Sequence, residues 1–329
     1  MKSVQEFEDL SIRRVELHKV GVFKDLVLEF PRKREEDAQK AEVHIFVGAN
    51  GTGKTTLLEA MTFFRIKPMA DFARELGTFQ SLETEKGSLI SKIDFDQNPH
   101  PIQIEFRNGW TCKQEQMPVN QSLPSFPFAD YLKNYYFHPK PPRPDSIRYA
   151  FFAANGYRRF SEPKVKLSIE NPFYLSLAFE SKQTETEILQ WIPKRVAQAN
   201  QAQLAGNIDE AKKYRRHIAA IEDAVSKIIQ RKIEFRVDFI NGLVECLLDG
   251  KSVVLEIMAS GHQAILNFLL DLMYRLEYLP EGNLSHFSLF LDEIDIHLHP
   301  GAQRQILPVV RELFPNAQIF LTTHSPFVI

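Results

Sequence analysis

The sequence is short of cysteine, glycine and long apolar runs, and each shortage excludes a class of protein. Only two cysteines, Cys112 and Cys246, occur among 329 residues, and no CxxC pair accompanies them, which excludes a disulfide scaffold. The acidic, polar N-terminal segment is unlike a secretory signal, and no apolar run approaches the ~18 residues of a membrane-spanning helix. We therefore expect a protein of the reducing cytoplasm that does not contact a membrane.

Net charge is almost absent as well. The chain has 40 basic and 42 acidic residues, and its formal charge of −2 provides no overall attraction for nucleic acid, although a local basic face stays open. With 44% hydrophobic and 25% charged residues, the composition is that of an ordinary soluble globular protein. The length suits one large α/β domain with insertions or two smaller domains.

Glycine is scarce, yet three of the 14 glycines lie within six positions. They belong to GANGTGKT at 48–55, which matches G-x-x-x-x-G-K-[ST], a loop whose backbone N–H groups surround phosphates at a helix N-terminus. The match lies between an apolar stretch at 43–47 and helical spacing at 55–64, so we expect a strand, a phosphate loop and a helix in that order. An ordinary glycine-rich turn is the alternative. The predicted nucleotide-binding residues are Asn50, Gly51, Thr52, Gly53, Lys54, Thr55 and Thr56.

Two side chains of this loop have specific expected roles. Lys54 is expected to lie against the β- and γ-phosphates, because a lysine at this position of the motif reaches them. The hydroxyl of Thr55 is expected to take one coordination position on Mg²⁺.

Two buried strands further along the chain are expected to end in polar residues. The strand at 287–291 leads into Asp292 and Glu293, and a core tolerates adjacent carboxylates only beside a cation or several donors. We expect Asp292 to hold the metal and Glu293 to orient and deprotonate the attacking water; a solvated strand terminus is the alternative. The strand that begins at Ile319 leads to His324, a candidate donor to a γ-phosphate oxygen, although a lone histidine is usually structural.

A second anion site is predicted at the start of an apolar helix. The stretch MASGHQ at 258–263 precedes this helix, and Ser260 is expected to cap it and leave its N-terminal dipole exposed. Because one helix N-terminus already serves the phosphate loop, a second one suggests an anion bound from two sides, by one subunit or by two. Ser-Gly before a helix is common, so an ordinary helix start is the competing interpretation.

The remaining segments indicate a β-rich N-terminal half and a helical insertion. Alternation at 12–30 around Gly21 predicts a β-hairpin, and alternation at 88–116 with turns at Asn98-Pro99 and Asn108-Gly109 predicts an antiparallel arm. The segment 118–144 has seven prolines among its aromatic residues, and we expect it to form an irregular cover over the core or a docking surface for a partner.

A helical hairpin is predicted at 187–203 and 208–230. Gly206 is expected to end the first helix, and Asn207 and Glu210 are spaced as a capping box for the second. Pro193 is expected to kink or interrupt the first helix.

These motifs together resemble those of the ABC-type ATPases, in the branch that contains the SMC chromosome proteins and the OLD-family ATPases of bacterial phage defence. The likeness is carried by GANGTGKT at 48–55, MASGHQ at 258–263, FLDEIDIHLHP at 290–300 and TTHSP at 322–326. The resemblance implies an α/β fold: an ABC-type P-loop ATPase core with a mixed central sheet, an antiparallel β arm and a short helical-hairpin insertion.

The resemblance also implies a homodimer, or a higher oligomer, in which ATP and Mg²⁺ lie between subunits. Each ATP would be held by the phosphate loop of one subunit and by Ser260 and Gly261 of the facing subunit, and the stretch 298–300 would cross the interface. The roles carried over are phosphate binding by Lys54 and Thr55, metal binding by Thr55 and Asp292, general base for Glu293, and γ-phosphate sensing for His324.

Two departures from the family pattern stand out. The strand at 147–154 leads into Asn155-Gly156-Tyr157-Arg158-Arg159, without the glutamine that usually contacts the metal; Arg158 or Arg159 would replace it at the phosphate, or both are exposed structural arginines. Ala259 and His262 also differ from the usual signature, so we expect a weaker or altered contact across the interface. The predicted parts are an N-terminal nucleotide-binding lobe (1–86), a β arm and cover segment (87–160), a helical insertion (161–234) and a C-terminal lobe (235–329).

The function predicted from these residues is ATP hydrolysis at a dimer interface that controls an associated effector, a nuclease or a toxin, in phage defence. The chain stops at Ile329, where OLD relatives continue, so we expect either a fragment or a separate effector subunit, as in Septu- and PARIS-type ATPases. One alternative is an ATP-dependent scaffold with little turnover. Another is an ATPase of DNA repair or chromosome maintenance, in which the helical hairpin contacts DNA through Lys212, Lys213, Arg215 and Arg216.

Overall fold

The computed structural model describes residues 11–20, 22–62, 89–95, 102–107, 109–114, 150–156, 185–238, 243–253, 258–279 and 285–328. The predictions for the proline- and aromatic-rich segment 118–144 and for Arg158 and Arg159 lie outside these residues.

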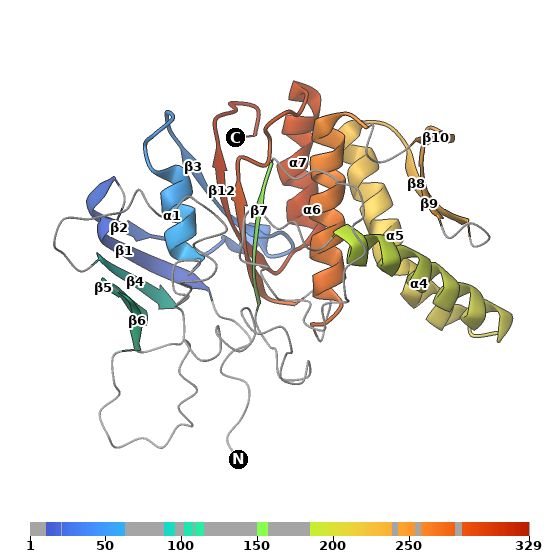
Figure 1. The fold of residues 1–329 in the computed structure, drawn as a ribbon, viewed down its shortest axis with the longest axis horizontal. Helices are drawn as coiled ribbons and strands as arrows, with labels where there is room; N and C mark the ends of the chain where they lie inside the picture. Colours follow the sequence, from blue (N-terminus) through green and yellow to red (C-terminus); the bar gives the residue numbers. More distant parts are fainter. Residues whose placement is uncertain are drawn as a thin grey trace, which may run out of the picture.

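A parallel sheet of four strands forms the centre of the fold (Figure 1). Its order is β3, β12, β11, β7, and every neighbouring pair is parallel. Strand β12 is buried along its whole length and β11 along all but its last residue, which explains why both read as continuous apolar runs. The bounds are β3 Glu42–Val47, β7 Ala150–Asn155, β11 Phe287–Asp292 and β12 Ala317–Thr323.

A second, antiparallel sheet holds the predicted hairpin and the predicted arm. Strands β1 and β2 pair as a hairpin, and β4, β5 and β6 extend the same sheet from β1, in the order β2, β1, β4, β5, β6. Strands β5 and β6 pair from Ile102 with Gln114 to Arg107 with Gly109, so Gly109 of the predicted turn belongs to β6, and Asn108 lies outside the described residues. The bounds are β1 Ile12–Val20, β2 Phe23–Glu29, β4 Leu89–Phe95, β5 Ile102–Arg107 and β6 Gly109–Gln114.

Helices cover both faces of the parallel sheet. Helix α1 lies between this sheet and the antiparallel sheet, whereas α6 and α7 lie on the other side, with α5 and α4 beyond them (Figure 1). The bounds are α1 Lys54–Met61, α4 Glu185–Leu204, α5 Ile208–Ile229, α6 Ser260–Leu276 and α7 Pro300–Leu313. This arrangement confirms the predicted α/β class with its β arm and helical hairpin, although the parallel and antiparallel strands that were expected in one mixed sheet lie in two sheets.

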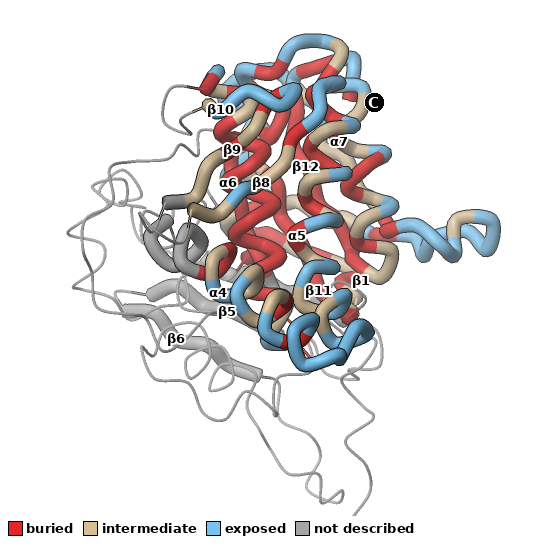
Figure 2. The backbone as a smooth tube through the Cα atoms, turned by 90° about the vertical axis from the view of Figure 1, so that its right-hand side faces the viewer, coloured by how far each residue is buried: buried red, intermediate tan, exposed pale blue. Residues whose placement is uncertain are grey.

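Helix α6 is the central helix of this side. Almost every residue from Gly261 to Leu276 is buried, because the helix is enclosed by its neighbours instead of facing solvent with one stripe (Figure 2). This enclosure explains why the sequence of α6 is apolar on all sides of the helix. The adjoining β8 (Ile233–Asp238), β9 (Leu243–Leu248) and β10 (Lys251–Val253) form a small antiparallel sheet, and a short 3₁₀ turn lies at Glu35–Asp37.

The helical hairpin has the predicted bounds within two residues, but its turn differs in detail. Gly206 has φ +81°, and the N–H of Asn207 donates to the carbonyl of Ala202, which closes the turn as a Schellman motif. The predicted capping box is wrong, because the side chain of Asn207 makes no capping hydrogen bond. Pro193 lies inside α4 without ending it. Among the described residues, no helix combines the length and apolarity needed to cross a bilayer.

A buried polar cluster joins the two sheets at the base of the fold. Gln318 on β12 accepts from the N–H of Ile12 (2.8 Å) and donates to its carbonyl (2.9 Å) and to Glu42 (2.7 Å). Arg13 and His44 also contact the Glu42 carboxylate, each at 2.7 Å. Burial alone raises the pKa of Glu42, but hydrogen bonds from His44, Arg13 and Gln318 outweigh it and lower the pKa to about 2.

Candidate functional site

The polar ends of the parallel strands meet at one edge of the sheet. In the strand register Asp292 lies beside Thr322 on β12 and beside Asn155 on β7, while Thr323 lies beside Val47, the last residue of β3 before the phosphate loop. Ligands of parallel α/β sheets bind at this carboxyl edge. The register therefore brings three of the predicted motifs together although they are far apart in the chain.

The phosphate loop has the backbone that its glycines predict. Gly51 and Gly53 have φ values of +77° and +92°, which residues with a Cβ rarely adopt. A Cβ on Gly53 would also lie 2.5 Å from the side chain of Val22. Lys54 donates to the carbonyls of Gly48 (2.9 Å) and Ala49 (3.0 Å) of its own loop. The ammonium group is thus held over the concavity of the loop.

A threonine and an aspartate come together where a metal is predicted. The hydroxyl of Thr55 lies 3.1 and 3.0 Å from the two carboxylate oxygens of Asp292. Thr322 donates to the same carboxylate at 2.6 Å and accepts from the N–H of Glu293 at 3.0 Å. A hydroxyl and a carboxylate at this separation are the hard oxygen donors that Mg²⁺ prefers. The donor set therefore fits the predicted ion.

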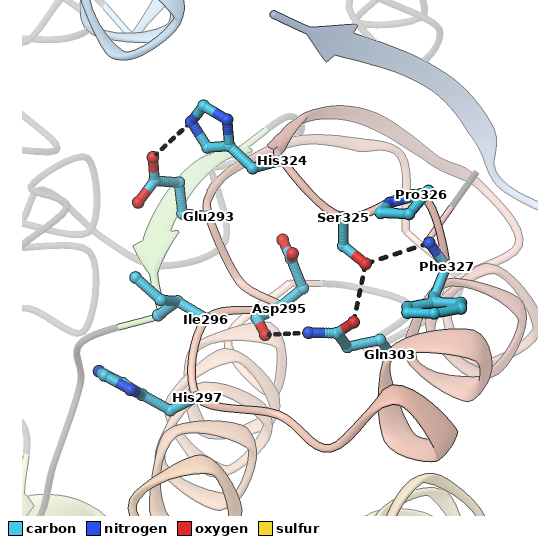
Figure 3. A pocket seen from close by; sticks show the side chains of 9 residues that line it. All are labelled: Glu293, Asp295, Ile296, His297, Gln303, His324, Ser325, Pro326 and Phe327. Carbon is cyan, nitrogen blue, oxygen red and sulfur yellow. Dashed lines mark hydrogen bonds and ion pairs between the residues drawn. The ribbon is translucent and has the colours of Figure 1, made fainter. Parts of the chain in front are cut away.

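Glu293 and His324 also lie together. Nε2 of His324 is 3.3 Å from a carboxylate oxygen of Glu293, and both side chains are partly open to solvent (Figure 3). Glu293 has φ +48°, and its N–H donates to both the carbonyl and the hydroxyl of Thr322. A non-glycine residue in this region is strained, and strain of this kind clusters at functional sites. The side chain of Glu293 is thus held by its backbone at the end of β11.

The loop after β7 lacks the glutamine of the family pattern, and a glycine there performs a packing role. The N–H of Gly156 donates to the carbonyl of Asp292 at 3.1 Å, and a Cβ on Gly156 would lie 2.1 Å from the carbonyl oxygen of Glu293. Only a residue without a side chain fits so close to the acidic strand end. The preceding Asn155 is buried beside Asp292.

Ser260 and Gly261 lie at the start of α6, with one correction. The N-cap of α6 is Ala259 and makes no side-chain capping bond, so Ser260 is the first helical residue and the predicted Ser260 cap is wrong by one position. Gly261 packs against the loop after the acidic strand, since a Cβ there would lie 2.6 Å from the carbonyl oxygen of His297. The parallel sheet separates α6 from α1 (Figure 1). Within one chain, the predicted signature and the phosphate helix therefore lie on opposite faces of the sheet.

A pocket of about 370 Å³ opens beside Glu293 and His324 (Figure 3). It is lined by Glu293, Asp295, Ile296, His297, Gln303, His324, Ser325, Pro326 and Phe327. The sequence motifs did not identify Thr322, Gly156 or Asp295 as residues of this site. For Thr322, the signal was present: it belongs to the polar end of a buried strand directly before the histidine. Gly156 and Asp295 have no local signal, because their partners come from other segments.

Two family matches cover the parts of the chain that carry the motifs. The family described as "AAA domain" matches residues 14–124, which include the phosphate loop. The family described as "AAA domain, putative AbiEii toxin, Type IV TA system" matches residues 248–329, which include the α6 start, the acidic strand end and His324.

Curated relatives share these regions at moderate identity. The chain is 26% identical over 170 residues to the "Retron Ec83 probable ATPase" of Escherichia coli, a match that covers 49% of this chain and 30% of that protein. It is 29% identical over 83 residues to the "Septu protein PtuA" of Bacillus thuringiensis, covering 23% of this chain and 21% of that protein. The matched part is thus less than a third of the length of either relative.

The fold has a counterpart among solved structures. An Smc head domain with an extended coiled coil, solved with the C-terminal domain of ScpA from Pyrococcus furiosus, superposes with a TM-score of 0.52 at 13% identity, over 97% of this chain and 91% of that chain. This likeness concerns the fold. The chain is therefore similar to AAA-family domains over residues 14–124 and 248–329 and to a probable ATPase of a retron, and its fold is like that of an Smc head domain.

Proposed function

We propose that the chain binds ATP with Mg²⁺ and hydrolyses it at the carboxyl edge of the parallel sheet. The observation that carries this proposal is the pairing of Thr55 with Asp292 directly beside the pairing of Glu293 with His324. One pair supplies oxygen donors for a hard cation, and the other supplies a carboxylate and an imidazole for proton and phosphate chemistry.

Each side chain then has a role that its position suits. The N–H groups of residues 50–56 would surround the phosphates at the start of α1, and the Nζ of Lys54 would leave its loop carbonyls to contact the β- and γ-phosphates. Mg²⁺, held by Thr55 and Asp292, would neutralise charge that develops on the phosphates. Glu293 would accept the proton of the attacking water, while His324 would donate to a γ-phosphate oxygen.

A second copy of the chain would complete the site. Ser260 and Gly261 begin α6 on the face of the sheet opposite α1 (Figure 1). They would therefore contact the phosphate loop of another subunit and not that of their own chain. A facing subunit related by two-fold symmetry would bring them to the other nucleotide, because such an interface repeats each contact twice. The stretch 298–300, which follows the pocket loop, would lie in this interface.

We further propose that the ATPase controls an associated effector in defence against phage. The named relatives are a retron ATPase and a Septu protein, and the chain matches only part of each. ATP-dependent pairing of two copies would expose or assemble the surface that the effector recognises. Either a nuclease or a toxin encoded beside this chain would serve as that effector.

The decisive experiment compares the chain with its Glu293→Gln variant. We expect the parent to hydrolyse ATP in the presence of Mg²⁺, and the variant to bind ATP, stay dimeric with it in light scattering, and lose turnover. Glu312→Gln, an exposed exchange of the same type on α7, is the matched control. Turnover of the Glu293→Gln variant at the parental rate would remove Glu293 as the base. ATP-dependent dimers without turnover in the parent would instead favour a scaffold.

One observation favours a DNA contact as a second candidate. Lys212, Lys213, Arg215 and Arg216 are all exposed on α5 of the helical hairpin. Reversing these four charges should weaken binding of duplex DNA and reduce its dependence on salt, because each phosphate contact releases counterions. Unchanged affinity would make this surface an ordinary solvated helix face.

A further inference from the structure

Side-chain hydrogen bonds link the loop after the acidic strand to the turn that carries His324. Four residues form this link, which we call the Asp295 ring: Asp295 in the loop, Thr323 and Ser325 on either side of His324, and Gln303 on α7. None of them belongs to the predicted nucleotide or metal site.

The ring closes through successive contacts. The hydroxyl of Thr323 hydrogen-bonds to the carboxyl of Asp295 and accepts from the N–H of Ser325 at 2.9 Å. The hydroxyl of Ser325 donates to Gln303 at 2.7 Å and accepts from the N–H of Phe327 at 3.1 Å. The amide of Gln303 donates back to the carbonyls of Asp295 (3.2 Å) and Leu298 (3.1 Å) (Figure 3). His324 therefore sits on a turn that is clamped on both sides.

Three of the four ring residues are buried, and Gln303 is half-buried. Asp295 is 5% exposed, Thr323 is 0% exposed and Ser325 is 8% exposed, although His324 between the last two is open to solvent. Hydrogen bonds in such surroundings hold geometry more firmly than exposed ones, because water does not compete for their donors and acceptors. A shift of the Asp295 loop would thus move both Glu293, two residues before it, and the His324 turn.

One atom of the ring is not satisfied by the fold. Oδ1 of Asp295 is buried and has no hydrogen-bond partner among the residues that the structure describes. An unpaired buried acceptor destabilises the fold, and a charged one does so more strongly. Burial accordingly raises the pKa of Asp295, against the opposing effect of the Thr323 hydrogen bond. Stability alone therefore does not explain a buried carboxylate with an unsatisfied oxygen at this position.

We propose that Asp295 is a positioning residue of the hydrolytic site, which acts through the Asp295 ring to hold the His324 turn in register with Glu293. This inference rests on the proposed ATPase function and adds a requirement to it. Misplacement of reacting groups by about 1 Å costs roughly 100-fold in rate, so the ring matters for turnover while ATP binding depends on the separate phosphate loop.

The first test exchanges Thr323, whose hydroxyl makes two ring contacts. Thr323→Val keeps the shape and removes the hydroxyl, whereas Thr323→Ser keeps the hydroxyl. We expect Thr323→Val to lower kcat by roughly 10- to 100-fold with the Kd for ATP unchanged, and Thr323→Ser to restore turnover. Thr62→Val is the matched control, because Thr62 is equally buried and its hydroxyl donates to Glu59 outside the ring.

The second test, Asp295→Asn, separates positioning from stability and keeps the question answerable if Thr323→Val fails to fold. The amide removes a buried charge one of whose oxygens is unsatisfied, so Tm should stay or rise while kcat falls. Parental kcat in both variants, or a joint loss of ATP binding and Tm, would overturn the assignment. A parent that binds no ATP would overturn the proposed function instead, which distinguishes the two failures.

Discussion

The hydroxyl of Thr55 and the carboxylate of Asp292 lie within hydrogen-bond distance although 237 positions separate them in the chain. Thr55 lies in the first turn of helix α1, and Asp292 ends strand β11. Thr322 holds the other side of the same carboxylate. The contact thus joins one face of the sheet to its central strands at the point where a cation would be coordinated.

Removal of the Thr55 hydroxyl should reduce the contribution of Mg²⁺ to ATP binding. Thr55→Ala deletes one oxygen donor, and a contact to a charged group is worth about 1.5–3 kcal/mol, or roughly 10- to 100-fold in Kd. Calorimetry with and without Mg²⁺ measures the effect. Thr55→Ser retains the hydroxyl and should bind like the parent. An equal benefit from Mg²⁺ in the alanine variant would contradict the assigned donor pair.

Gly156→Ala should disturb the acidic strand end from the neighbouring strand. The new Cβ would lie 2.1 Å from the carbonyl oxygen of Glu293, so the backbone must move, at a cost of about 1–3 kcal/mol. We expect a lower Tm together with reduced ATP turnover. Gly301→Ala is the control, since its Cβ would meet its nearest atom at 3.4 Å. Equal Tm and equal ATP turnover in both variants would show that the close approach of Gly156 to Glu293 affects neither stability nor activity.

The buried cluster around Glu42 should make the fold sensitive to acid. The pKa of Glu42 falls from 4.5 to about 2 on folding, so its stabilisation is present above pH 4.5 and is lost as the pH falls toward 2. This lowering of the Glu42 pKa corresponds to about 3 kcal/mol of folding stability at pH 7. Glu42→Gln should therefore lower the free energy of unfolding at pH 7 and flatten its decline between pH 5 and pH 3, roughly the range set by this shift.

Urea unfolding across this pH range tests the prediction. Glu36→Gln, at a side chain that is 71% exposed, provides the control and should leave the profile unchanged. Parallel pH profiles for the parent and the Glu42→Gln variant would show that Glu42 does not provide the stabilisation.

Glu277 should anchor the helical hairpin to α6. Its carboxylate lies just beyond the end of α6, accepts from Trp191 at 2.8 Å and contacts Arg195 of α4, and it lies 3.0 Å from His217 of α5. Burial raises the pKa of Glu277, but these three partners lower it overall. Removing one member of such a buried pair costs about 3–5 kcal/mol.

The measurement is hydrogen exchange along α4 and α5. Glu277→Ala should accelerate exchange in both helices, because their common acceptor is lost. Glu210→Ala removes the exposed pair with Tyr214 and serves as the control. Unchanged exchange in the Glu277→Ala variant would leave the apolar contacts of the hairpin as its sole anchor.

Local patterns anticipated much of this fold. The apolar runs at β11 and β12 predicted buried strands, because parallel strands inside a sheet are covered on both faces and need no alternation. The run at β3 also predicted a strand, but β3 lies at the edge of the sheet and is only partly buried. The stretch 208–230 predicted the second helix of the hairpin, and Gly206 predicted the end of the first. Two cap predictions differ from the structure: Asn207 is the N-cap of α5 but makes no side-chain capping bond, and the N-cap of α6 is Ala259 instead of Ser260. Helix starts depend on backbone angles and close contacts that a residue type alone does not specify.

The sequence by itself determined the phosphate loop, the acidic strand end and the strand that carries His324, since each depends on neighbouring residues and on local backbone conformation. The tertiary structure decided which of these segments meet. The parallel register places Asp292 beside Thr322 and Asn155, and packing makes Gly156 and Asp295 neighbours of the site. Such contacts join residues far apart in the chain, and their geometry follows from how strands align and helices pack.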